Sequence, residues 1–156
     1  MRDLTRLVLL GAAAGAAGTT ALNAVTYLDM AVRGRPTSST PEDTVEALSA
    51  TTHVPVPGDG DTRDNRIAGL GPLTGLLAGV GVGALLGAGR AAGWRPGLGA
   101  GSAAATLLAL VGTNGPMTVL GVTDPRTWPV SSWVADVVPH LAYGAVTAVV
   151  LDRLDD

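Results

Sequence analysis

The stretch GPLTGLLAGVGVGALLG, residues 71 to 87, decides the fold. It places a glycine at every fourth position, and four residues make about one turn of an α-helix, so the glycines share one helix face. In water each glycine weakens a helix by about 1 kcal/mol relative to alanine, whereas in a membrane small residues let two helices approach closely. The stretch therefore predicts a membrane-spanning helix with a packing face made of Gly71, Gly75, Gly79, Gly83 and Gly87.

The composition of the 156-residue chain is also typical of a membrane protein. Only 15% of its residues are charged, against about a quarter in soluble domains, and the mean hydropathy is +0.36. There is no cysteine, which excludes disulfides and thiolate metal sites. All ten basic residues are arginines scattered along the chain, so no nucleic-acid partner is expected. Abundant alanine and glycine without lysine indicate a GC-rich genome and hence a bacterial source.

Four apolar segments are each long enough to cross a bilayer, which takes about 20 residues. We expect an all-α, integral membrane four-helix bundle that forms a single domain, with both termini on one side. The arginines divide five and five between the two sides, and the usual dominance of the first helix favours cytoplasmic termini. The spans are predicted at residues 4–31, 67–89, 97–122 and 132–151.

The first of these segments has a second interpretation as a secretory signal peptide, with Arg2 and Arg6 ahead of an alanine-rich run. The apolar run continues to Val25, however, which is longer than a signal-peptide core of about 7–15 residues. As a membrane span, the segment is the expected partner of the glycine stretch. Further small-residue positions for close helix packing lie at Gly11 and Gly15 in the first span and at Gly101 in the third.

Residues 32–66 form the only sizeable extramembrane segment. Within it, TPED at residues 40–43 is typical of a helix start, and we expect a short amphipathic helix near residues 41–50 on the membrane surface. The acidic residues that follow do not have the spacing of a calcium-binding loop. A solvated turn is expected for Asp59, Asp61, Asp64 and Asn65.

Two further expectations concern the last two spans. Pro116 removes a backbone hydrogen bond, so a kink or break is expected in the third span at residues 113–116. After the fourth span, the charged residues are expected to end the chain in water: Asp152, Arg153, Asp155 and Asp156.

Polar side chains gather at one membrane side of the predicted bundle. Such groups are costly in hydrocarbon unless they face the bundle interior and pair with one another. Asp136 and His140 are four residues apart and so share a helix face. We expect an intramembrane polar cluster made of Asn23, Tyr27, Thr74, Asn114, Asp136, His140 and Tyr143.

Two interpretations of this cluster stay open. It can be a proton- or ligand-binding pocket, with His140 titrating and Asp136 orienting it, or a set of hydrogen bonds that only holds helices together. One histidine and one aspartate supply fewer ligands than the three or four of a zinc site, so no metal or other cofactor is expected. No G-x-S-x-G motif or other nucleophile arrangement occurs, so no catalysis is expected.

The C-terminal part contains a sequence pattern that resembles a known family. It consists of LGVT at residues 120–123, Pro125, Trp128-Pro129, Asp136, His140-Leu141 and Tyr143. This pattern, which covers about 25 of the 156 residues, resembles the last part of the YagU-type bacterial inner-membrane proteins. The resemblance implies an integral membrane protein and supplies no catalytic residues.

The sequence thus predicts a small multi-pass protein of the bacterial inner membrane. Its expected role is structural, accessory or in assembly, with the lipid bilayer, further copies of the chain or a larger membrane complex as partners. The alternative is a small transport or pH-responsive protein that uses Asp136, His140 and Asn114.

Overall fold

The computed structural model describes residues 3–155, and all regular elements in this range are helices. The all-α prediction is confirmed. In chain order the elements are α1 (Leu4–Arg33), α2 (Thr40–Thr52), α3 (Gly60–Ala91), α4 (Leu98–Val119), the short 3-10 helix η1 (Pro125–Thr127) and α5 (Val130–Asp155).

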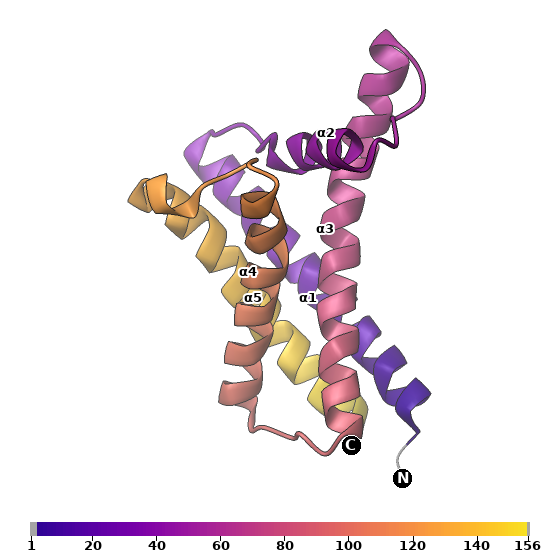
Figure 1. Ribbon diagram of the computed structural model, residues 1–156. Helices are drawn as coiled ribbons and strands as arrows, with labels where there is room; N and C mark the ends of the chain where they lie inside the picture. Colours follow the sequence, from indigo (N-terminus) through magenta and orange to yellow (C-terminus); the bar gives the residue numbers. More distant parts are fainter. Residues whose placement is uncertain (1–2, 156) are drawn as a thin grey trace.

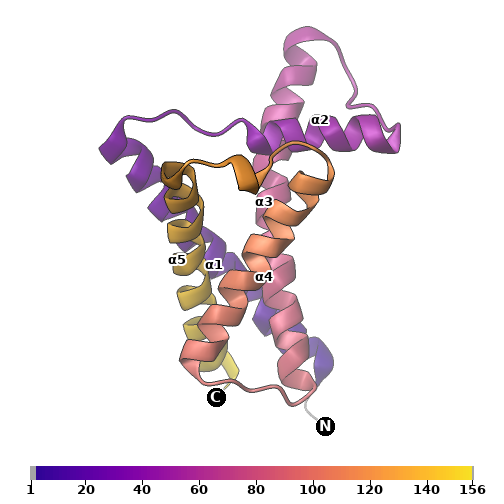
Figure 2. The same ribbon diagram turned by 60° about the vertical axis from the view of Figure 1, so that its left-hand side comes forward.

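Four long helices run along the body of the molecule, and α2 lies across one end of it (Figures 1 and 2). The start of α1, the end of α5 and the α3–α4 connection share one end, called the terminal end below. The α1–α2 connection, α2 and η1 lie at the opposite end, called the loop end. The chain therefore runs along the body four times, alternating in direction.

Three of the described helices, α1, α3 and α5, are long and apolar enough to cross a membrane. Large apolar side chains on these helices and on α4 point outward, such as Leu77, Leu85 and Val111 with exposed fractions of 61%, 65% and 69%. An outward apolar surface of this extent suits a lipid environment. α4 carries no charged residue, but its second half contains Thr113, Asn114 and Pro116, and it does not reach the same hydropathy.

The interior contact between α1 and α3 is made through glycines. A Cβ atom on Gly11 would lie 2.9 Å from the Cα of Gly87, and one on Gly15 would lie 3.0 Å from the Cα of Gly83. A Cβ on Gly79 would overlap the hydroxyl of Thr19. Because real Cβ atoms essentially never come this close to backbone atoms, this contact, called the glycine seam below, requires residues without side chains.

Three of the predicted packing glycines do not make close contacts between long helices, so the glycine positions do not act as one uniform packing face. Gly71 lies against Pro41 of α2 rather than against another long helix. A Cβ atom on Gly75 would meet nothing within 4 Å, and one on Gly101 would lie at an ordinary van der Waals distance of 3.7 Å from Ala148. The stripe is straight along α3, but α1 crosses it at an angle and covers only its second half.

α5 makes close contacts with α1 and with α4 through two glycines that were not predicted as packing positions. Gly18 of α1 lies against Thr147 and Tyr143, and Gly144 of α5 lies against the backbone of Thr106 in α4. Close contacts were expected among the first three spans, but α4 packs chiefly on α5 and has few contacts with α3. Toward the loop end α1 diverges from α3 (Figures 1 and 2), and the four long helices surround a space there.

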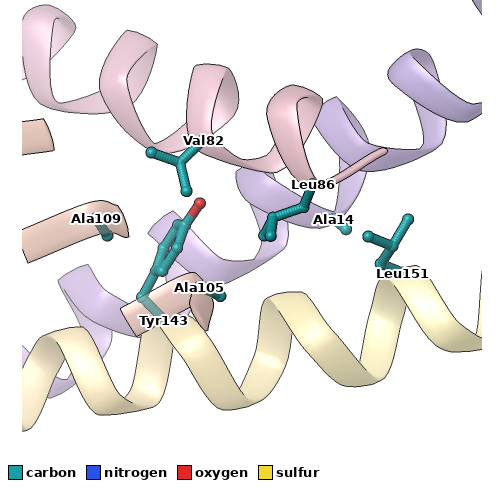
Figure 3. Close-up of a cluster of buried hydrophobic side chains, with 7 residues drawn as sticks. All are labelled: Ala14, Val82, Leu86, Ala105, Ala109, Tyr143 and Leu151. Carbon is teal, nitrogen blue, oxygen red and sulfur yellow. The ribbon is translucent and has the colours of Figure 1, made fainter. Parts of the chain in front are cut away.

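The buried core lies where these contacts meet. Figure 3 shows the ring of Tyr143 extending from α5 toward Val82 of α3, with Leu86 beside it. Small side chains from α1 and α4 complete the cluster, which consists of Ala14, Val82, Leu86, Ala105, Ala109, Tyr143 and Leu151. These side chains fill the interior of the helix bundle, so the space at the loop end does not extend past them.

Two helix boundaries differ from the sequence prediction. α3 begins at Gly60, so Asp61 and Asp64 belong to its first turns, where the helix dipole favours acidic residues, and not to a solvated turn. α4 continues through Pro116 to Val119, so of the expected kink or break the break does not occur. It ends at a Gly121 turn with φ +73°, in which the N–H of Val122 bonds the carbonyl of Met117 at 2.9 Å.

The terminal end contains a buried ion-pair cluster, which corrects the expectation that the last charged residues all lie in water. The side chain of Asp155 is only 1% exposed and pairs with Arg90 at 3.3 Å and with Arg95. Arg90, itself 10% exposed, also pairs with Asp152 at 3.3 Å. Arg153 is exposed as expected, and Asp156 lies outside the described residues.

Candidate functional site

A cavity of about 620 Å³ opens at the loop end between α1, α3, α4 and α5. It lies where α1 has diverged from α3, and the volume lies within the range of about 300–1,000 Å³ that is usual for small-molecule sites. Six of the seven residues of the predicted polar cluster line it: Asn23, Tyr27, Asn114, Asp136, His140 and Tyr143. Thr74 does not line the cavity, and its hydroxyl donates to the carbonyl of Gly71 in its own helix at 2.7 Å.

Asp136 is the centre of the polar wall. The amide of Asn114 donates to its Oδ2 at 2.8 Å and so links α4 to α5, while Nδ1 of His140 lies 3.5 Å from its Oδ1. The Asp136 side chain remains 20% exposed to the cavity. A carboxylate has about four acceptor positions, so these two neighbours leave Asp136 able to interact with a molecule in the cavity.

The neighbouring His140 is held by its own helix. Its Nδ1 lies 2.7 Å from the backbone carbonyl oxygen of Asp136, which can only accept, so we assign the proton to Nδ1. In the neutral ring Nε2 is then an acceptor, and it lies 3.4 Å from the hydroxyl of Thr113. Because the Thr113 hydroxyl also donates to Ala109 at 2.9 Å, Nε2 has no strong donor of its own among these contacts.

Tyr143 forms the floor of the cavity. Its hydroxyl donates to the carbonyl of Gly79 at 2.7 Å, and the side chain is only 1% exposed. Val82 and Ala109 line the cavity beside it. Below this floor lie the core and the glycine seam, so the cavity ends inside the body and does not pass through to the terminal end.

Asn23 and Tyr27 are the predicted cluster residues on the α1 wall. Both are exposed to the cavity, and neither side chain forms a hydrogen bond with another residue in the range 3–155. Asn23 precedes the last residue of α1 by ten positions, a depth of about 15 Å by helical rise. An amide at this depth needs water or another polar partner, because an unpaired polar group in hydrocarbon is costly.

The mouth of the cavity carries two arginines that share one aspartate. Arg33 and Arg35 lie 2.7 Å and 2.5 Å from the carboxylate of Asp29, and both arginines border the cavity. These pairs are partly exposed, so they contribute little to stability. Two positive charges and one negative charge therefore lie at the mouth, which leaves one positive charge in excess. All three lie outside the polar wall around Asp136.

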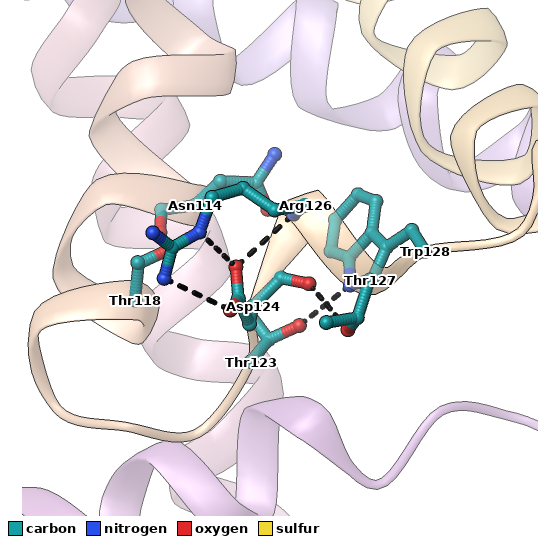
Figure 4. Close-up of polar contacts among 7 residues, drawn as sticks. All are labelled: Asn114, Thr118, Thr123, Asp124, Arg126, Thr127 and Trp128. Atoms are coloured by element: carbon teal, nitrogen blue, oxygen red, sulfur yellow. Dashed lines mark hydrogen bonds and ion pairs between the residues drawn. The ribbon is translucent and has the colours of Figure 1, made fainter.

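The loop before α5 fixes an indole ring at the edge of the cavity (Figure 4). Nε1 of Trp128 donates to the hydroxyl of Thr123 at 2.8 Å, and both residues line the cavity. The loop is held by Arg126, which bonds both carboxylate oxygens of Asp124 at 2.9 and 3.0 Å. This guanidinium holds the pKa of Asp124 below its usual value, so the loop keeps its ion pair to lower pH.

Sequence reasoning missed Trp128, Thr113 and the two arginines as cavity residues. Trp128 is part of the pattern that resembles a known family, but a Trp-Pro pair in a loop does not indicate whether the indole points toward the interior of the bundle. Thr113 lies one turn from Ala109, and small residues at this spacing indicate helix packing rather than a cavity. Within the described range, no group of three or more acidic or histidine side chains is arranged to hold a metal ion.

No protein-family model matches the chain, and comparison with curated proteins and with solved structures found no match either.

Proposed function

We propose that the protein is an integral membrane protein that crosses the bilayer four times, in the bacterial inner membrane with cytoplasmic termini. Support for four crossings comes from α4, which carries no charge and runs beside α5 between the same two ends. Its polar residues Thr113 and Asn114 face the cavity, which accounts for its lower hydropathy without removing it from the membrane. In this arrangement α2 lies at the membrane surface.

Within that topology, we place the function in the cavity and infer a non-enzymatic transport or ligand-responsive role. The observation that carries this inference is a cavity with polar side chains on its inner wall, which opens at one end of the body and ends at Tyr143, above a tightly packed seam. A membrane protein with such a cavity can accept a polar molecule from one side only. The cluster of Asn114, Asp136 and His140 supplies acceptors and donors at its inner wall.

A structural or assembly role is the second candidate. The small-residue faces that favour it are largely used inside the chain, because Gly11, Gly15, Gly83 and Gly87 are buried between α1 and α3. What still favours it is Gly75, whose Cβ position has no neighbour within 4 Å and so is not used for packing inside the chain. The proposed resemblance to YagU-type proteins is compatible with both roles.

Cysteine accessibility tests the role, since the natural chain has no cysteine to interfere. In membrane vesicles, Asn23→Cys is expected to react quickly with a hydrophilic, membrane-impermeant thiol reagent added on the side of α2. Ala24→Cys is the matched control: it lies at the same depth, is exposed, and does not line the cavity. It is expected to react at least about tenfold more slowly, because thiols in lipid do not form the thiolate readily.

Equally slow reaction at the two positions would mean that the cavity holds no water, and equally fast reaction would mean that Ala24 does not face lipid; either result would remove the basis for a transport or ligand role. Protection of Asn23→Cys only when a partner complex is present would favour the assembly role instead.

A further inference from the structure

The cavity gathers most of the aromatic residues of the chain. The protein has only three tryptophans and two tyrosines and no phenylalanine, and three of these five, Tyr27, Trp128 and Tyr143, line the cavity. Aromatic faces attract cations through the negative charge above the ring, and the attraction is stronger where water is excluded. This enrichment gives the cavity a chemistry that the polar cluster alone does not have.

The inner wall of the cavity carries a charge of the matching sign. Asp136 is the acidic side chain on the cavity wall, where it accepts a hydrogen bond from the uncharged amide of Asn114 and lies 3.5 Å from Nδ1 of His140. The two arginines at the mouth both pair with Asp29. A cation that passes the mouth therefore meets a carboxylate at the inner wall.

We propose that the cavity binds a lipophilic organic cation, with Asp136 as counter-charge and the rings of Trp128 and Tyr27 as its walls. The indole of Trp128 is held in place by its bond to Thr123 and by an edge-on contact with Trp133, whose ring centre lies 5.2 Å away. A ring fixed before binding loses little freedom when a ligand arrives. Val82, Ala109 and Leu76 supply apolar surface for the rest of the molecule.

This inference rests on the proposed ligand role, and the two can fail separately. If Asn23→Cys is accessible to water but no cation binds, the ligand role stands and the ligand class is wrong. If Asn23→Cys is inaccessible, both fail.

Tetraphenylphosphonium and tetraphenylborate make a matched pair of probes, because they have nearly the same shape and opposite charge. Titration calorimetry of the full chain in detergent is expected to give saturable binding of the cation at one site per chain and much weaker binding of the anion. Asp136→Asn is expected to weaken cation binding at least about tenfold, because a carboxylate near a bound cation interacts strongly in a partly buried site. Trp128→Leu is expected to weaken it by about threefold to thirtyfold.

Asp64→Asn is the control for Asp136→Asn: it removes one negative charge at an exposed position of α3 that does not line the cavity, and is expected to leave binding unchanged. Thermal unfolding of each variant shows whether it is folded. Cation binding that is unaffected by Asp136→Asn in a folded protein would overturn the proposal. Tighter binding of tetraphenylborate, lost in Arg35→Gln, would assign the cavity to an anionic amphiphile instead.

Discussion

Replacing Gly83 by alanine is expected to lower the free energy of unfolding by about 3 kcal/mol or more, at the upper end of the cost of overpacking a core. The new Cβ would overlap the carbonyl oxygen of Gly11 and lie 2.6 Å from the Cα of Gly15. Both are backbone atoms, so no change of side-chain rotamer relieves the overlap. The helices α1 and α3 must separate, and all other contacts of the glycine seam weaken with them.

Gly75→Ala is the matched control in the same helix and the same stripe. Its Cβ would meet nothing within 4 Å, so the variant is expected to be as stable as the natural protein or slightly more stable. Thermal unfolding in detergent, followed by circular dichroism, measures both variants. If Gly83→Ala and Gly75→Ala unfold at the same temperature, α1 and α3 do not pack through this seam.

The second large effect is expected at the terminal end, where Arg90→Ala should destabilise the protein by about 3 kcal/mol, since removal of one partner leaves a buried charge. The Asp155 carboxylate is 1% exposed and would keep Arg95 as a partner, but it would lose the contact with the more deeply buried Arg90. Arg90 also joins α3 to the end of α5 through Asp152. The expected result is early separation of these helix ends on heating.

Arg153→Ala serves as the control, because it removes the same charge from an exposed position in the last turn of α5. It is expected to change stability by less than about 0.5 kcal/mol. In the double variant Arg90→Ala, Asp155→Asn the loss should be smaller than the sum of the two single losses, since the two residues share one interaction. Additive losses would show that the pair is not coupled.

Helix class and the position of the apolar segments could be predicted because both follow from composition and from the fourfold glycine spacing. The α1–α3 contact followed from the same spacing, since Gly11 and Gly15 repeat it. Helix crossing angles do not follow from a one-dimensional pattern, so the different surroundings of Gly71 and Gly75 could not be predicted. Gly18 was within reach, since it lies seven residues after Gly11 and so on nearly the same helix face.

The gathering of polar residues at the loop end was predictable from their distances to the helix ends, which place Asn23, Asn114 and His140 at similar depth. Their partners were not predictable: Asn114 bonds Asp136 and not His140, and Asn23 faces open space. The cavity itself arises because α1 crosses α3 at an angle and diverges from it toward the loop end, and a crossing angle cannot be read from the sequence. The buried Asp155 was missed because its partner Arg90 lies 65 residues away in sequence.

The most direct test of the four-span arrangement is the sidedness of single cysteines at Ala92, Thr51 and Thr127. All three positions are exposed, the first in the α3–α4 connection at the terminal end and the other two at the loop end. An impermeant maleimide is expected to label Thr51→Cys and Thr127→Cys from one side of the membrane and Ala92→Cys from the other. Labelling of Ala92→Cys and Thr127→Cys from the same side would show that α4 does not cross the membrane and would contradict the four-span arrangement.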